Sequence, residues 1–241
     1  MLETKISVKS FDVFPNSTIK PSAIQRYMQQ LAREDCDALG CTYNQMRDVN
    51  MVFVITKLAM HIEKPVFAYD ELTVRTFNNR VAGITYEREF EFFRDGEKII
   101  HATTQWVIVK YDTRKLVRPR EFPFPIPEHN LDCGSIEIPR NLNAKELPAC
   151  AERVVRLSDL DENDHLNNCI YSDISLDYIP FDRKDDFVSE MRIIFHHEAK
   201  IQDVLSIGLA EKEGRYVVAA YNSTNESVCF EADCVLGKIS R

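Results

Sequence analysis

Glycine is scarce in this sequence, which contains seven glycines among its 241 residues. Neither of the glycine-rich fingerprints of the common nucleotide-binding folds, GxGxxG and GxxxxGKS/T, is present. Long apolar stretches are also missing: the longest, Tyr216–Tyr221, has six residues, whereas a membrane-spanning helix needs about 20. The chain does not open with a basic region and an apolar stretch, so no signal peptide is predicted. We therefore expect a soluble protein that does not enter membranes.

Positive charge is in deficit, since 30 Lys and Arg stand against 38 Asp and Glu, and the formal net charge is −8. An acidic surface repels nucleic-acid phosphates, so we expect no nucleic-acid partner. The seven cysteines are an odd number and include no CxxC pair. They predict reduced, buried thiols rather than a disulfide framework or a zinc site.

Proline is concentrated in one part of the chain, because six of the ten prolines lie between Pro119 and Pro148. Proline favours extended or turn backbone and is excluded from helix interiors and central strands. We therefore interpret residues 112–150 as a linker between an N-terminal domain, residues 1–111, and a C-terminal domain, residues 151–241.

The first domain is predicted to contain one strand, one helix and four further strands. Leu2–Val8 alternates as a strand, and a helix follows that begins at Pro21 and is stopped by Gly40. The apolar residues of this helix recur at the spacing of one buried face: Ile24, Tyr27, Met28, Leu31 and Ala32. Asp95-Gly96 is a strong hairpin signal between the last two of the four strands, which are predicted over Met51–Glu63, Glu71–Phe77, Ile84–Arg94 and Lys98–Tyr111.

The second domain repeats this succession. A strand over Glu152–Leu157 precedes a helix from Asn167 or Asn168 to Ile179, which Pro180 ends. A helix wrapped by an antiparallel sheet, present twice, is an α+β fold, and two such sheets can join edge to edge and cover their exposed edges. The four strands of this domain are predicted over Val188–Glu198, Val204–Lys212, Arg215–Asn222 and Val228–Leu236.

The densest polar cluster precedes the second helix and contains Asp161, Asn163 and His165 at alternate positions. Alternate side chains of extended backbone project to one side, so a carboxylate, an amide and an imidazole would converge. They would also lie beside a helix N-terminus, whose N–H groups and dipole stabilise a developing oxyanion. The alternative is a solvated loop in which Asn167 or Asn168 caps the helix.

A second polar cluster, His196-His197-Glu198, ends a predicted strand, on which His196 and Glu198 would share one face. A metal site could gather Asp161, His165, His196 and Glu198. No HExxH-type motif supports such a site, and we expect no metal. A polar strand end that faces water is the other alternative.

The segment from Asp159 to Asn168, DLDENDHLNN, resembles the active-site stretch of the acyl-acyl carrier protein thioesterases of plants and bacteria. Two further segments are similar to that family: Met51–Lys57 with the following Glu63-Lys64-Pro65, and Gln105-Trp106-Val107 leading into Asp112–Leu116. The resemblance covers essentially the whole chain, in order.

This resemblance implies two tandem hotdog domains, in each of which a long helix is wrapped by an antiparallel sheet. It implies hydrolysis, without a cofactor, of the thioester between a fatty acyl chain and acyl carrier protein in fatty acid biosynthesis. The N-terminal domain would supply the acyl pocket. By position, Asp161, Asn163 and His165 match the family's catalytic stretch, and Glu198 matches the acidic residue of its later strand.

One departure from the family narrows the mechanism. Ala199 stands where many plant members have a cysteine, which excludes a cysteine–histidine mechanism at that position. The chain also lacks the plastid transit segment of plant members, so the resemblance points to a bacterial cytoplasmic enzyme.

The expected mechanism places the thioester carbonyl near the N-terminus of the second helix, polarised by backbone N–H groups and by Asn163 or His165. Glu198 with His165 is the expected acid–base pair, and Asp161 is either a nucleophile that forms an anhydride or an orienting carboxylate. A helix dipole would lower the pKa of the Cys169 thiol. Nevertheless we expect no thiolate mechanism, because Cys169 matches no catalytic residue of the family.

The first domain is expected to lack a site of its own. Alignment of Tyr27 with Tyr171 places residues without acid–base chemistry opposite the cluster of Asp161, Asn163 and His165, namely Ser17, Ile19 and Pro21.

Docking of an acidic carrier protein needs a local positive patch, for which four bases of the linker are the candidates: Arg114, Lys115, Arg118 and Arg120. An acyl-CoA thioesterase on the same fold and a non-catalytic module that binds acyl chains or carrier proteins remain alternatives. The acyl chain preference and a possible homodimer stay open.

Overall fold

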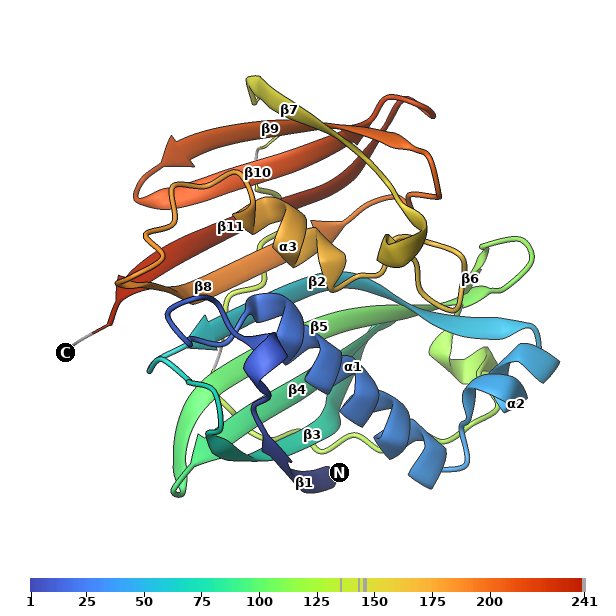
Figure 1. Ribbon diagram of the computed structural model, residues 1–241. Coiled ribbons are helices and arrows are strands. Elements are labelled where there is room, and N and C mark those ends of the chain that lie inside the picture. The colour runs from blue at the N-terminus through green and yellow to red at the C-terminus, as the bar shows by residue number, and fades with distance from the viewer. Residues whose placement is uncertain (135, 143, 145–146, 240–241) are drawn as a thin grey trace.

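The computed structural model describes residues 1–134, 136–142, 144 and 147–239 of the chain. In this part the strands form one sheet whose neighbouring strands are all antiparallel (Figure 1). The short strand β6 (Leu116–Val117) pairs with β5 (Glu97–Lys110) and stands outside the order of the other ten strands. The order across the sheet is β1 (Leu2–Ser7), β3 (Glu71–Ala82), β4 (Thr85–Arg94), β5 (Glu97–Lys110), β2 (Met51–Ile62), β8 (Asp186–Phe195), β11 (Ser227–Lys238), β10 (Arg215–Asn222), β9 (Val204–Lys212) and β7 (Ala149–Val154).

The two halves of the sheet have the same strand order in opposite directions. Starting from the centre, the first half runs β2, β5, β4, β3 and β1, and the second runs β8, β11, β10, β9 and β7. The halves meet where β2 pairs with β8, from Lys57 opposite Ile194 to His61 opposite Glu190. The predicted duplication and the edge-to-edge joining of the two sheets are confirmed.

Helix α1 (Pro21–Ala38) crosses the sheet of the first half (Figure 1). Proline is at its first position, and Gly40 follows its end with a φ of +73°, which a residue without Cβ adopts at no steric cost. Ile24, Met28 and Leu31 are buried. The predicted start, stop and buried face of this helix are therefore confirmed.

The short helix α2 (Tyr43–Asp48) was not predicted. Thr42 caps it: its hydroxyl accepts a hydrogen bond from the Gln45 N–H, and the Gln45 side chain accepts from the Thr42 N–H. This reciprocal capping box has a sequence signature of Thr followed three residues later by Gln.

Helix α3 (Ile170–Leu176) of the second half is much shorter than predicted. The Asn167 side chain accepts a hydrogen bond from the Cys169 N–H at 2.9 Å, and the Asn167 carbonyl accepts from the Ile170 N–H at 2.9 Å. Asn167 thus holds the chain in a turn before the helix. At the other end, Pro180 disfavours helical backbone at the residue before it.

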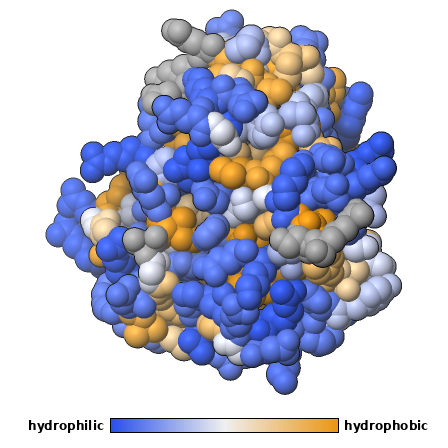
Figure 2. All heavy atoms as spheres, turned by 90° about the vertical axis from the view of Figure 1, so that its left-hand side faces the viewer, coloured by the Kyte–Doolittle hydropathy of each residue, from blue (hydrophilic) through white to orange (hydrophobic). Residues whose placement is uncertain are grey.

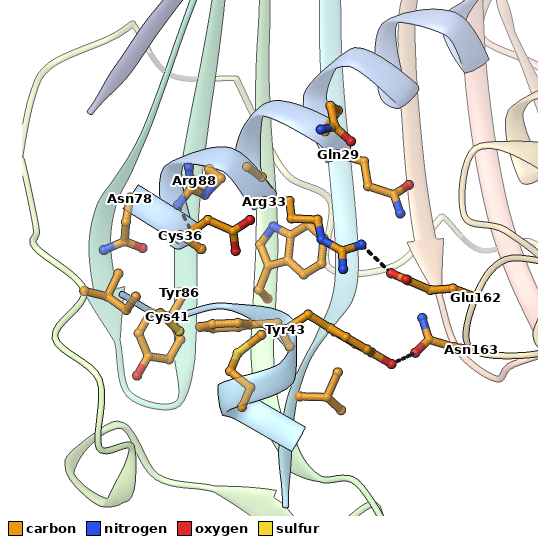
Figure 3. Close-up of a pocket in the computed structure, with 18 of the residues that line it drawn as sticks. Gln29, Arg33, Cys36, Cys41, Tyr43, Asn78, Tyr86, Arg88, Glu162 and Asn163 are labelled. Carbon is orange, nitrogen blue, oxygen red and sulfur yellow. Dashed lines mark hydrogen bonds and ion pairs between the residues drawn. The ribbon is translucent and has the colours of Figure 1, made fainter. Parts of the chain in front are cut away.

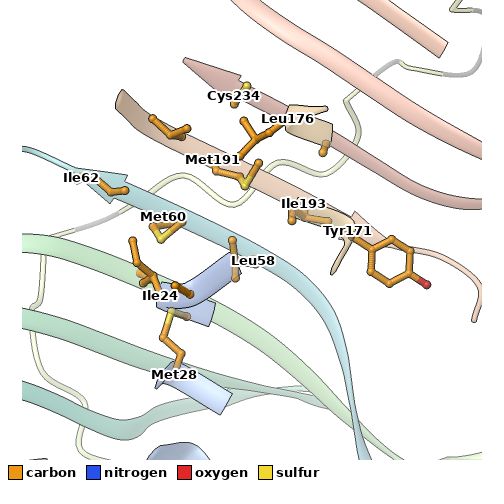
Figure 4. Packing of buried hydrophobic residues seen from close by; sticks show 14 of the residues in the cluster. Ile24, Met28, Leu58, Met60, Ile62, Tyr171, Leu176, Met191, Ile193 and Cys234 are labelled. Carbon is orange, nitrogen blue, oxygen red and sulfur yellow. The ribbon is translucent and has the colours of Figure 1, made fainter. Parts of the chain in front are cut away.

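One hydrophobic core serves both halves, because α1 and α3 lie on the same side of the sheet (Figure 1). Figure 4 shows the core at the junction, where Met60 of β2 lies beside Met191 of β8. Both side chains are 1% or less exposed. The two halves therefore bury apolar surface against each other as well as within themselves.

The proline-rich segment runs along the outer face of the sheet, opposite the helices. The carbonyl groups of Asn78 and Asn79 accept hydrogen bonds from the N–H groups of His129 and Asn130, and the Lys57 ammonium donates to the Pro139 carbonyl at 2.8 Å. The segment therefore covers charged side chains of this face that would otherwise be solvated.

The local signals of the other elements give mixed results. Asp95 and Gly96 have φ values of +52° and +81°, which confirms the predicted hairpin turn. β8 ends at Phe195, three residues before the predicted end.

No helix of the described residues is long and apolar enough to cross a membrane. On the face shown in Figure 2, hydrophobic residues surface in small groups that hydrophilic residues separate.

Candidate active site

Extended backbone was expected for the cluster of Asp161, Asn163 and His165. In the structure, the cluster lies in a tight turn instead. The Asp161 N–H donates to the His165 carbonyl at 2.9 Å, and the Asp161 carboxylate accepts from the Asn163 N–H at 2.8 Å. Asp164 closes the turn with a φ of +62°, a conformation that Asp tolerates better than most residues. The three side chains still converge, but the turn brings them together rather than the alternation of a strand.

Glu198 lies in the loop after β8 and not on the strand. The Leu166 N–H donates to the Ala199 carbonyl at 2.8 Å and ties this loop to the turn. The neighbouring residues therefore face each other: His165 Nε2 is 3.0 Å from Glu198 Oε2. A carboxylate this close stabilises a protonated imidazole, so the two groups can act together in taking up and returning a proton.

All four predicted site residues line one cavity of about 170 Å³, together with Thr56, Trp106 and other residues of β2 and β5. His196 and His197 also line this cavity, but they have partners elsewhere: His196 Nε2 is 3.2 Å from Glu231 Oε2, and His197 Nδ1 is 2.9 Å from the Val228 carbonyl. Among the described residues, no group of three or more His, Cys, Asp and Glu side chains could hold a metal ion.

Arg114, one of the four bases of the predicted docking patch, also lines this cavity. Its guanidinium Nη2 is 3.2 Å from the Glu198 carboxylate, and both side chains are about two-fifths exposed. Glu198 therefore contacts a cation on one side and His165 on the other. This contact could not be predicted from local spacing, because Arg114 lies in the turn between β5 and β6, 84 residues from Glu198.

A second, larger cavity of about 350 Å³ adjoins the first. The two share Val52, Phe53, Trp106 and Asn163. Most of the other lining residues come from α1, α2 and the strands of the first half, and most of the exposed lining surface is apolar (Figure 3). This cavity is the candidate for the acyl pocket that was expected in the first half.

The first half contains a turn of the same shape as the turn of the site. Its Phe14 N–H donates to the Thr18 carbonyl at 2.8 Å, and Ser17 has a φ of +68°. The hydrogen bonds match those of the second half one by one, so the predicted register was wrong. The residues opposite Asp161, Asn163, His165 and Glu198 are Phe14, Asn16, Thr18 and Pro65. None of them can act as an acid or base at neutral pH, as was expected of the first half.

Cys169 is buried, with 1% of its surface exposed, and its thiol donates to the Gln29 side-chain oxygen at 3.5 Å. Burial raises the pKa of Cys169 to about 12. The expectation that a helix dipole lowers the pKa of Cys169 was wrong. Helix α3 has only seven residues, and the desolvation of the buried thiolate outweighs the effect of its dipole.

Two N–H groups at the start of α3, those of Cys169 and Ile170, are not free to polarise a thioester carbonyl as was expected of this helix end. Asn167 already accepts from the N–H groups of Cys169 and Ile170. The side-chain amides of Asn163 and Asn168 also line the cavity and carry N–H donors.

Two family models match the chain: the acyl-ACP thioesterase N-terminal domain over residues 1–121 and the acyl-ACP thioesterase C-terminal domain over residues 143–234. Among curated proteins, an oleoyl-acyl carrier protein thioesterase 2 of Arabidopsis thaliana is 25% identical over 92% of this chain. One of Coriandrum sativum is 26% identical over 73% of the chain. The chain spans 66% and 53% of the lengths of these two relatives.

Two solved structures share the fold. An acyl-ACP thioesterase from Bacteroides thetaiotaomicron superimposes with a TM-score of 0.86 at 20% identity and covers 98% of this chain and 97% of its own. A 12:0-ACP thioesterase from Umbellularia californica has a TM-score of 0.81 at 17% identity, with the same coverage of both chains. The α+β fold of two tandem hotdog domains is confirmed. Because the family models match most of the sequence, the chain belongs to the acyl-ACP thioesterase family.

Proposed function

We propose that the protein hydrolyses the thioester of fatty acyl-acyl carrier protein and releases a free fatty acid and the carrier thiol. The observation that carries this proposal is the pair of His165 and Glu198, 3.0 Å apart, in a cavity that also holds Asp161 and Asn163. The membership in the thioesterase family and the adjoining apolar cavity support the same chemistry.

Hydrolysis consumes one water molecule and needs two proton transfers, one from the water to the pair of His165 and Glu198 and one from the pair to the departing sulfur. The water oxygen forms a bond to the thioester carbonyl carbon while the pair of His165 and Glu198 takes up its proton. The negative charge that develops on the carbonyl oxygen is stabilised by a hydrogen-bond donor, for which the Asn163 amide is available. When the carbon–sulfur bond breaks, the proton passes to the departing sulfur and restores the pair.

Asp161 acts in this scheme as an orienting carboxylate rather than as a nucleophile. One of its oxygens accepts from the Asn163 N–H at 2.8 Å, and this hydrogen bond holds the turn in shape. Mass spectrometry after rapid quenching tests the assignment, since an anhydride at Asp161 would add the mass of the acyl group to its peptide. We expect no such adduct.

The experiment that tests the function is release of free thiol from acyl chains of matched length on acyl carrier protein and on coenzyme A. We expect a higher kcat/KM with the carrier protein. Preference for coenzyme A would make the protein an acyl-CoA thioesterase of the same fold, and no turnover of either would leave a binding module.

Two finer expectations belong to this proposal: action in a bacterial cytoplasm and pairing of two chains. Fractionation of the native cells tests the first, and light scattering of the purified protein tests the second.

A further inference from the structure

The catalytic turn of the second half is touched by one phenol of the first half. The Tyr43 hydroxyl, at the start of α2, lies 2.6 Å from Oδ1 of Asn163 (Figure 3). We propose that Tyr43 is a positioning residue, which fixes the Asn163 amide so that its Nδ2 group donates to the thioester oxygen. This inference rests on the proposed function and adds a residue that lies outside the catalytic stretch.

The direction of the hydrogen bond between Tyr43 and Asn163 follows from the contact of Tyr43 with Arg47. Arg47 Nη1 donates to the Tyr43 oxygen at 3.1 Å. A guanidinium has no acceptor, so the Tyr43 oxygen must accept from Arg47, and its own hydrogen is left for Asn163. The atom of Asn163 that receives this hydrogen must be an acceptor, which is the amide oxygen and not the amide nitrogen.

This arrangement leaves Nδ2 as the free end of the amide. The Asn163 N–H is used by the Asp161 carboxylate, and Oδ1 is used by Tyr43. In the part of the chain that the structure describes, Nδ2 has no hydrogen-bond partner. Figure 3 shows this nitrogen on the side of the amide away from the Tyr43 hydroxyl.

Tyr43 itself is held in place by cations on its ring. The Arg33 guanidinium lies 5.2 Å from the ring centroid and the Arg47 guanidinium 5.7 Å. Arg47 in turn lies 3.3 Å from the ring centroid of Tyr111. These contacts fix a side chain at the boundary of the two cavities, since Tyr43 lines the larger one and Asn163 lines both.

The test is a double-mutant cycle on acyl-carrier protein hydrolysis with Tyr43→Phe, Asn163→Ala and the double variant. Loss of one hydrogen bond of ordinary strength predicts a fall in kcat of about 3- to 10-fold for Tyr43→Phe, with KM little changed. Loss of an oxyanion donor predicts a fall of about 10²- to 10³-fold for Asn163→Ala. Because Tyr43 acts through Asn163, Tyr43→Phe should have no further effect on kcat in the Asn163→Ala background.

Tyr221→Phe is the control, since it removes an exposed phenol hydroxyl on β10 at a residue that lines neither cavity. We expect its kcat to equal that of the wild type. Three results would overturn the positioning role while the thioesterase function stands. They are a wild-type kcat for Tyr43→Phe, a double variant whose fall in kcat is the product of the two single falls, and a rise in KM alone for Tyr43→Phe. If the wild type turns over no thioester at all, the proposed function fails, and this inference fails with it.

Discussion

Replacement of Glu198 by glutamine keeps the shape of the side chain and removes its charge and its ability to take up a proton. His165 then lacks the carboxylate that stabilises its protonated form, and the loss of a general acid–base group lowers kcat by about 10²- to 10⁴-fold. His165→Ala should give a loss of the same order. Since the two residues act as a unit, the double variant should be no slower than the slower single variant.

The effect on stability should be small, because Glu198 is on the surface of the cavity. Its side chain is 41% exposed and that of Arg114 39%, and ion pairs as exposed as this contribute about 0 to 1 kcal/mol. In a protein of this size, 1 kcal/mol shifts Tm by about 2–4 °C. Glu198→Gln should therefore abolish most turnover with a Tm change below about 4 °C.

The assay is thiol release from acyl-carrier protein beside a thermal unfolding curve, with Glu97→Gln as control. Glu97 forms an ion pair with Lys64 at 2.7 Å that is more exposed than that of Glu198, and neither residue lines the cavity. Its variant should match the wild type in kcat. A kcat for Glu198→Gln within tenfold of the wild type, or losses for His165→Ala and Glu198→Gln that multiply, would refute the acid–base assignment.

Three further outcomes are expected. Cys169→Ala should keep most activity, because its buried thiol has a pKa of about 12 and is protonated at neutral pH; turnover of the variant measures this. Arg114→Gln should lower kcat by about 3- to 10-fold through loss of one contact that holds the Glu198 carboxylate, which steady-state kinetics will show. The free energy of unfolding should fall as pH rises above about 9. Burial raises the pKa of Cys41, Cys169 and Cys234 from 9.0 to about 12, so the unfolded chain loses these protons at lower pH than the folded chain does. Urea unfolding curves at pH 8 to 11 test the sign of this change.

The elements that could be predicted from the sequence are those whose signals are local. Helix α1 has proline at its start, glycine after its end and one apolar stripe, and each signal is read from a few neighbouring residues. The Asp95-Gly96 turn is local in the same sense. The length of α3 was wrong because the apolar pattern continues past Leu176, while the backbone around Asn167 and Pro180 decides where the helix lies.

The sequence pointed to four residues that lie together, but not to the backbone geometry that brings them together. Asp161, Asn163, His165 and Glu198 line one cavity, yet the backbone that carries them is a turn and a loop. Arg114 and Tyr43 were missed for a different reason. They are 84 and 120 residues away from the groups they touch, and no spacing within the chain encodes a contact across the two halves.

The matching turns of the two halves explain how one site serves two hotdog domains. Asn16 occupies the place of Asn163, and each of these amides bonds across to the other half: Asn16 Nδ2 donates to the Asp186 carbonyl at 2.7 Å, whereas Asn163 Oδ1 accepts from Tyr43 at 2.6 Å. The first contact uses the donor end of the amide and ties the turn to the start of β8. The second uses the acceptor end and leaves the donor for a substrate. Phe14, opposite Asp161, packs against Phe181 with ring centroids 4.7 Å apart. The same turn is therefore tied to β8 in the first half and lines the proposed catalytic cavity in the second, and the two amides use opposite ends for these contacts.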